Sequence, residues 1–142
     1  MTMHFDGPVI VPAADPDDGE RTARALAPRL GSSSTAVVVH VVEKAGGGID
    51  KAPMGAQEDV ATDIFERARG PLESAGATVE TDILYGTDIV ETIFDGARER
   101  DADAVAFVPR EGNRIAELLT GDVARRMVKE ASIPVVVLPQ VE

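Results

Sequence analysis

Short, strongly apolar runs alternate along the chain with segments whose apolar residues recur every three or four positions. The runs contain β-branched residues and each ends at a glycine, a proline or an acidic residue, so each predicts a strand. They lie at 8–12, 35–43, 78–86, 103–109 and 133–139. The run "TAVVVHVVE" at 35–43 is apolar almost throughout, which is typical of a strand covered on both faces.

The segments between these runs have helical spacing. Apolar residues at 23, 26, 27 and 30, at 60, 64, 68 and 72, and at 89, 93 and 97 each fall on one face of a helix. Together with capping residues they predict helices over 15–31, 58–75, 87–102 and 123–131, the first opened by acidic residues and closed by Gly31. The segment 44–57 has clustered glycines and no periodicity, so we predict a mobile surface loop there.

This alternation predicts an α/β fold, a single five-stranded parallel sheet with helices on both faces, formed by one domain over residues 1–142. Right-handed crossovers leave few topologies for such a sheet. Ligands of open parallel sheets bind beyond the carboxyl ends of the strands. We therefore expect functional residues in the loops after Val11, Val42, Leu84 and Val108.

Composition excludes several kinds of chemistry. The chain has no cysteine, which rules out disulfides, thiolate metal sites and cysteine nucleophiles, and its two histidines are too few for a histidine-rich metal site. No apolar run approaches the roughly 18 residues that span a bilayer, and the N-terminal "MTMHFDGPVIVP" lacks the features of a signal peptide. We expect a cytoplasmic protein without a membrane partner.

A net charge of −11 sets the long-range field. It repels nucleic-acid phosphates and anionic headgroups, so we expect no nucleic-acid partner. The acidity is spread along the chain in pairs and lysine is rare, which favours a halophilic protein whose self-repulsion is screened by concentrated salt. An ordinary acidic protein is the alternative.

The strands, turns and C-terminal segment together resemble the universal stress protein family. The resemblance rests on "VIVP" before an acidic turn, "VVVHVVE" before a long loop, "ETDILYGTDIVETI" followed by "ERDADAVAFV", and above all "LLTGDVARRMVKEASIPVVVLP". It implies the Rossmann-like fold of that family, a role in stress response, and commonly a homodimer in which the last strands pair. Here that strand is Ile133 to Leu138, an apolar edge that would be an aggregation hazard if left exposed.

Many members of this family resemble ATP binders with a phosphate loop Gly-x2-Gly-x9-Gly-Ser/Thr. Glycines let backbone N–H groups approach phosphates, and the hydroxyl adds a donor at the helix start. Gly121 matches the last glycine, but Glu111 and Val108 stand at the other two positions and Asp122 replaces the hydroxyl. A slip of one residue brings Gly112 near the second position, so at most two of the three glycines survive.

The family's aspartate after the first strand is also displaced, because Ala14 stands at its position and Asp15 one residue later. The resemblance nevertheless gives a set of candidate nucleotide-binding residues, which are Pro12, Ala13, Asp15, Val41, Gly112, Asn113, Gly121 and Asp122.

Asp122 bears most directly on ATP binding. A carboxylate about 4 Å from a phosphate charge, at an effective dielectric near 20, costs about 4 kcal/mol, or roughly a thousandfold in affinity. We predict that Asp122 caps its own helix and takes the donors a phosphate would need. The alternative is a ligand role through a bridging divalent cation. Arginines at 110, 114, 125 and 126 can partly neutralise an anion or make local helix pairs.

Other clusters point to structural roles. Asp15, Asp17, Asp18 and Glu20 predict a turn and an acidic first helical turn rather than a hard-cation site, because the glutamate of an EF-hand loop is missing. A phosphoacceptor receiver domain is disfavoured, since "ILYGTD" and "LPQVE" lack its third-strand aspartate and its lysine.

We interpret His40 as packed or hydrogen-bonded, Gly86 beside Tyr85 as a strand stop, and the serines at 32–34 as a linker. The chain shows no set of acid, base and nucleophile, so we expect no catalytic residues, no metal site and no enzymatic activity, with the weak ATPase named below as the alternative.

Three hypotheses follow. The first is a homodimeric regulatory or binding module, with possible protein partners and no cofactor, that does not hold ATP in the family manner. The second is an ATP-binding stress-response switch or weak ATPase that uses Gly112, Asn113, Gly121 and Asp122 with a divalent cation. The third is a structural protein that only forms oligomers.

Overall fold

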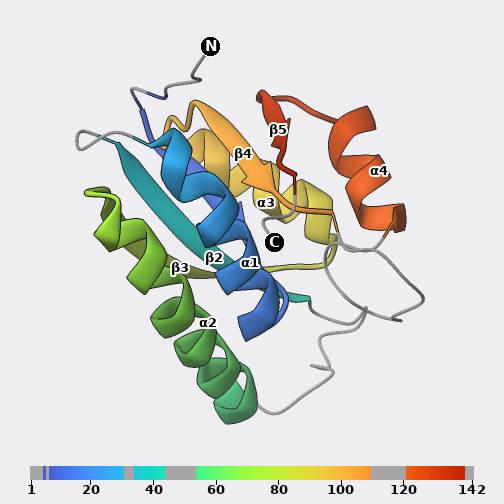
Figure 1. The fold of residues 1–142 in the computed structure, drawn as a ribbon. Helices are drawn as coiled ribbons and strands as arrows, with labels where there is room; N and C mark the ends of the chain where they lie inside the picture. Colours follow the sequence, from blue (N-terminus) through green and yellow to red (C-terminus); the bar gives the residue numbers. More distant parts are fainter. Residues whose placement is uncertain (1–4, 6, 31–33, 44–53, 110–120, 140–142) are drawn as a thin grey trace.

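The computed structural model describes residues 5, 7–30, 34–43, 54–109 and 121–139. Strands and helices alternate along the chain (Figure 1). In order they are β1 (Val9–Pro12), α1 (Pro16–Leu26), the 3₁₀ turn η1 (Ala27–Arg29), β2 (Thr35–Glu43), α2 (Met54–Ser74), β3 (Thr78–Gly86), α3 (Ile89–Glu99), β4 (Ala104–Phe107), α4 (Gly121–Lys129) and β5 (Val135–Val137).

The five strands form one sheet in the order β3-β2-β1-β4-β5, and every neighbouring pair is parallel. This confirms the predicted fold class. From β1 the chain adds β2 and β3 on one side and then β4 and β5 on the other, so the winding reverses between β1 and β4. In open parallel sheets this reversal opens a crevice beyond the carboxyl ends of the two strands. We call this region, with the turn at 12–15 and the start of α4, the switch-point edge.

Helices cover both faces of the sheet, and alternate residues of β1 show how the two halves of the core divide. Val9 and Val11 pack with α1 and α2, whereas Ile10 packs with α3 and α4. In Figure 1, α1 and α2 lie side by side in front of the sheet and α3 lies behind it. The central strands β1 and β4 are buried throughout, as expected when both faces are covered.

Several predicted helix boundaries differ from those of the structure, and the two largest errors have physical reasons. The first helix ends at Leu26 rather than at Gly31, because Pro28 has no N–H to donate and its ring clashes with the preceding turn; residues 27–29 tighten into η1. The second helix begins at Met54 rather than at 58, so the last four residues of the predicted loop are helical. Methionine, alanine and glutamine are good helix formers, and they offset the glycine among these four residues. Gly31 and the rest of that loop lie outside the described residues.

Among the helices of the described residues, none is both long enough and apolar enough to cross a membrane.

Candidate functional site

Three candidate residues lie together in the turn that leaves β1. Pro12 ends the strand, and the buried Ala13 donates its N–H to the carbonyl of Val39 over 3.0 Å. Asp15 is the N-cap of α1, since its Oδ1 accepts the N–H of Asp18 over 2.8 Å. This confirms the predicted capped start of the helix. It also uses one carboxylate oxygen of Asp15 within the helix.

The other candidate residues are more widely placed. Val41 is buried in β2 and packs with α3 and α4, on the face of the sheet opposite to Ala13. Gly121 is the first residue of α4. Gly112 and Asn113 lie outside the described residues. Just after β4, the N–H of Val108 donates to Thr22 Oγ1 over 3.3 Å. This hydrogen bond connects the end of β4 to α1.

Asp122 lies inside the first turn of α4, so the prediction that it caps the helix was wrong. A cap residue precedes the first helical residue, and the first helical residue of α4 is Gly121. The side chain of Asp122 is 91% exposed, and its Oδ1 pairs with Arg125 Nη1 at 3.6 Å. This is the predicted local pair. An ion pair this exposed contributes little stability, although an acidic side chain in the first turn suits the helix dipole.

Arg126 pairs with two carboxylates, one at the start of α3 and one just after α4. Its Nη2 donates to both carboxylate oxygens of Asp88, at 3.1 and 2.8 Å, and its Nε donates to Glu130 over 2.7 Å. Asp88 is itself the N-cap of α3 and accepts the N–H groups of Val90 and Glu91. The bond from Arg126 lowers the pKa of the Asp88 carboxyl, and the same guanidinium lowers the pKa of Glu130.

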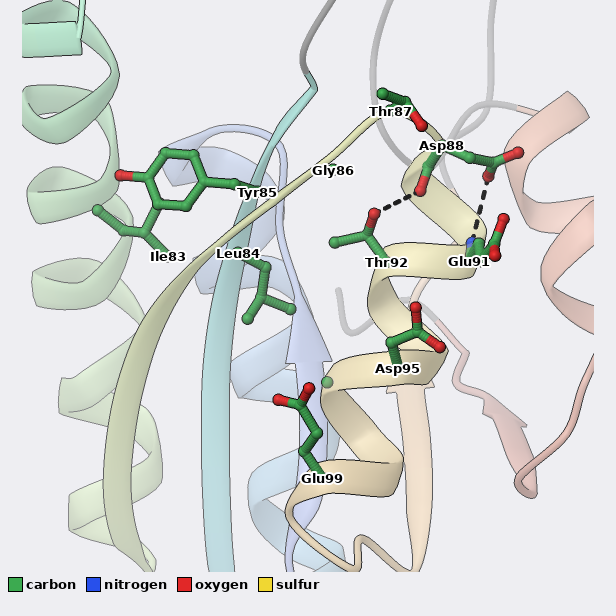
Figure 2. A pocket seen from close by; sticks show the side chains of 11 residues that line it. Ile83, Leu84, Tyr85, Gly86, Thr87, Asp88, Glu91, Thr92, Asp95 and Glu99 are labelled. Atoms are coloured by element: carbon green, nitrogen blue, oxygen red, sulfur yellow. Dashed lines mark hydrogen bonds between the residues drawn. The ribbon is translucent and has the colours of Figure 1, made fainter.

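A pocket of about 440 Å³ opens between the end of β3 and α3 (Figure 2). Four carboxylates line it, those of Asp88, Glu91, Asp95 and Glu99. Figure 2 shows Leu84 facing α3, while Tyr85 lies on the opposite side of the strand. We did not predict this pocket. The sequence held one indication of it, the spacing of acidic residues at 91, 95 and 99, which places them along one helix face.

Gly86 is the last residue of β3, as the strand-stop interpretation predicts, and close packing also explains its lack of a side chain. A Cβ at this position would lie 2.0 Å from Thr92 Oγ1. That hydroxyl already donates to the carbonyl of Asp88 over 2.6 Å. The end of β3 therefore packs so closely against α3 that there is no room for a side chain at residue 86.

The acidic cluster near the start of the chain is the predicted turn and first helical turn. Asp18 is buried and accepts from Arg21 over 2.8 Å, while Asp17 and Glu20 pair with Arg67 of α2. Within the ranges that the structure describes, no three histidine, aspartate or glutamate side chains are grouped so as to hold a metal ion.

The family model for the universal stress protein family matches residues 7–139, which is nearly the whole chain. The protein belongs to the universal stress protein family. This confirms the resemblance found in its strands and C-terminal segment. A curated relative, the stress response protein NhaX of Bacillus subtilis strain 168, is 31% identical over 81 residues. That match covers 57% of this chain, which spans 48% of the relative's length.

Solved structures of the family have the same fold. A universal stress protein from Archaeoglobus fulgidus superposes with a TM-score of 0.70 at 25% identity, over 98% of this chain and 100% of its own. The structure of the Archaeoglobus fulgidus protein in complex with dAMP gives 0.69 at 24% identity, covering 94% and 98%. These likenesses agree with the five-stranded parallel sheet described above.

Proposed function

We propose that this universal stress protein is a homodimeric regulatory or binding module that does not hold ATP in the manner of the family's phosphate loop. The observation that carries the proposal is the exposed carboxylate of Asp122, which lies in the first turn of α4 where a phosphate would approach the helix N-terminus. A helix N-terminus carries roughly half a positive charge, and a full negative charge on the same turn outweighs it.

The size of the repulsion depends on how well Asp122 is solvated. At 4 Å it is about 4 kcal/mol for an effective dielectric near 20 and about 1 kcal/mol in bulk water. Because the side chain is 91% exposed in the free protein, the cost of approach begins near the lower figure. It rises as a bound nucleotide excludes water.

The arginines of α4 do little to offset this charge. Arg125 pairs with Asp122 itself, and Arg126 is held by Asp88 and Glu130. An incoming phosphate would have to compete with carboxylates for both of them. In either register of the family loop at least one of its three glycines is missing, and this acts in the same direction because it restricts backbone approach.

The second candidate function is an ATP-binding switch or weak ATPase. Two observations favour it: the relative in complex with dAMP shares the fold, and the exposed carboxylate of Asp122 is open to a divalent cation. In that case Mg²⁺ would bridge Asp122 to the phosphates, and Gly112, Asn113 and Gly121 would supply backbone donors.

The homodimer is supported by the C-terminal strand. β5 is the last strand of the sheet on its side, and Val137 in it is 49% exposed. An apolar edge of this kind invites pairing with a second copy of the same strand. We propose that the pairing segment is Ile133 to Leu138, as the family resemblance implies.

A thermal-shift titration with ATP distinguishes the two candidates, because a ligand that binds only the folded state raises the melting temperature. The titration is run with and without Mg²⁺, in low salt and in molar salt, because the acidic composition predicts a halophilic protein. No shift up to millimolar ATP, in protein shown to be folded, supports the first candidate. A saturable rise that requires Mg²⁺ overturns it and supports the second.

A further inference from the structure

His40 is a buried histidine that the proposed function does not use. It lies in β2, is 6% exposed, and both of its ring nitrogens have polar neighbours. Nδ1 lies 3.0 Å from the carbonyl oxygen of Ala13, and Nε2 lies 3.3 Å from Oε1 of Gln57 in α2. The side chain therefore connects three parts of the fold: a central strand, the turn that leaves β1, and the first turns of α2.

The partner at Nδ1 determines the tautomer. A backbone carbonyl can only accept, so Nδ1 of His40 must carry the proton and donate to Ala13. In the neutral ring Nε2 then has a lone pair and needs a donor. The side-chain amide of Gln57 offers Nε2 a donor when its nitrogen faces the ring. It offers an acceptor when its oxygen faces the ring. Rotation of one amide thus lets Gln57 match the ring in either protonation state.

The hydrogen bond from His40 completes the attachment of Ala13 to β2. The N–H of Ala13 already donates to Val39, so with His40 both of its backbone polar groups are bonded to that strand. Two residues later Asp15 caps α1 at the switch-point edge. Without the imidazole, the carbonyl of a fully buried residue would lose its partner, which native structures avoid.

We propose that His40 is a positioning residue for the switch-point edge. Held by Gln57 as the tautomer protonated at Nδ1, it fixes the carbonyl of Ala13 and so sets the path of the turn that carries Asp15. This inference goes beyond the proposed function, because it holds whichever ligand the edge takes. It assigns a specific role to the polar side chain that is buried within β2.

The first test is the ¹⁵N NMR spectrum of the imidazole rings. The chain has only two histidines, His4 and His40, so a His4→Gln variant leaves one ring to assign. At pH 8.5, where an ordinary imidazole is neutral, we expect a proton on Nδ1 of His40 and none on Nε2. A ring protonated at Nε2 alone overturns the proposal, since that tautomer cannot donate to Ala13.

Replacement of the amide tests the second contact. Gln57→Met keeps the bulk of the side chain and removes its hydrogen bond, so exchange of the His40 Nδ1–H with solvent should speed up roughly threefold or more. Glu58→Met changes the neighbouring exposed residue of α2 and is the matched control, which should leave that exchange unchanged. Equal exchange of the ring N–H in all three proteins shows that Gln57 does not hold the ring.

Hydrogen exchange tests the effect on the turn. The amides of Asp18 and Gly19 report it, because they bond to the side chain and the carbonyl of Asp15. His40→Phe should speed their exchange roughly tenfold. His40→Asn places an amide N–H near the position of Nδ1 and should restore exchange to within about threefold.

If the two variants exchange alike, whether fast or slow, His40 does not position the turn through its hydrogen bond and the proposal fails. Should His40→Phe not fold, the comparison of His40→Asn with the parent still decides. An increase of tenfold in the asparagine variant also overturns the proposal.

Discussion

Arg126 of α4 donates to both carboxylate oxygens of Asp88, over 3.1 and 2.8 Å, and the same Asp88 caps α3. One carboxylate therefore satisfies the first turn of one helix and holds the neighbouring helix against it. Both helices cover the same face of the sheet, and α4 is the helix whose start forms part of the switch-point edge. Its attachment to α3 bears directly on the position of Asp122.

Loss of this carboxylate should cost more than loss of its partner. Asp88→Ala removes the cap and the ion pair, and we expect a loss of about 1 kcal/mol in the free energy of unfolding from the cap alone. Arg126→Gln keeps the cap and should cost less, since the ion pair is half-exposed. Urea unfolding of both single variants and the double variant measures the coupling. An equal loss in the two single variants would show that the cap contributes nothing.

The same ion pair predicts a dependence of stability on pH. The folded pKa of Asp88 lies below its ordinary value of 3.8, and that of Glu130 lies below 4.5. Carboxyls with lowered folded pKa values bind more protons when unfolded, so their stabilisation is present above these ordinary values and is lost as the pH falls through the folded ones.

Comparison with Arg126→Gln isolates the effect of the pair from general acid unfolding. We expect the parent to be the more stable protein at pH 7 and the two free energies of unfolding to converge below about pH 3.8. Urea titrations at a series of pH values between 7 and 3 provide the measurement. A difference that stays constant with pH would mean that Arg126 acts through packing rather than through charge.

The apolar pattern and the residues that end each segment predicted most of the fold. The strand at 35–43 is buried almost throughout and has the predicted bounds. The half-exposed strand at 78–86 also has them, because Gly76 and Gly86 mark its ends. Asp15 caps its helix as its position before an amphipathic segment suggests. The predicted end of α1 failed for a local reason. The apolar spacing continues to Leu30, but Pro28 cannot continue the helix.

The arrangement of charges could be predicted only in part. The pair between Asp122 and Arg125 follows from helical spacing, whereas Asp88 and Arg126 are 38 residues apart and meet only through the packing of two helices. The hydrogen bond between His40 and Ala13 could not be predicted either, because these residues are 27 positions apart and lie in different elements. Pairs within one helix can be found from the sequence, and pairs between elements require the structure.

Two glycines that line the same pocket should respond differently to alanine. In Gly86→Ala the added carbon would lie 2.0 Å from Thr92 Oγ1, whose hydrogen bond to Asp88 resists movement, so we expect a loss of about 1–3 kcal/mol. In Gly96→Ala it meets the end of the flexible Leu84 side chain at 2.9 Å, and a helix interior gains about 0.5–1 kcal/mol from alanine. Thermal unfolding should rank Gly96→Ala well above Gly86→Ala; the reverse order would contradict the packing argument.

The proposed homodimer makes the two edges of the sheet unequal. Val137→Lys puts two lysines into the paired β5 strands and should weaken dimerisation on the order of 100-fold, because their charges would be buried without partners. Tyr85→Lys places the same charge at the end of β3, the opposite edge strand, and should leave the dimer intact. Size-exclusion chromatography with light scattering measures both. A monomeric parent, or equal dissociation of both variants, would refute pairing through β5.

Replacement of Asp122 tests the proposed function at the residue that carries it. Asp122→Ser restores the family hydroxyl and removes a repulsion of about 1–4 kcal/mol, so ATP affinity without metal should rise between roughly fivefold and a thousandfold, and less in molar salt. Asp95→Ser removes the same charge from α3 and serves as the control. If Asp122 instead held a bridging cation, the serine variant would bind ATP more weakly with Mg²⁺ than the parent does. Calorimetric titration of all three proteins, with and without the metal, separates repulsion from bridging, because the two roles predict opposite signs for one substitution.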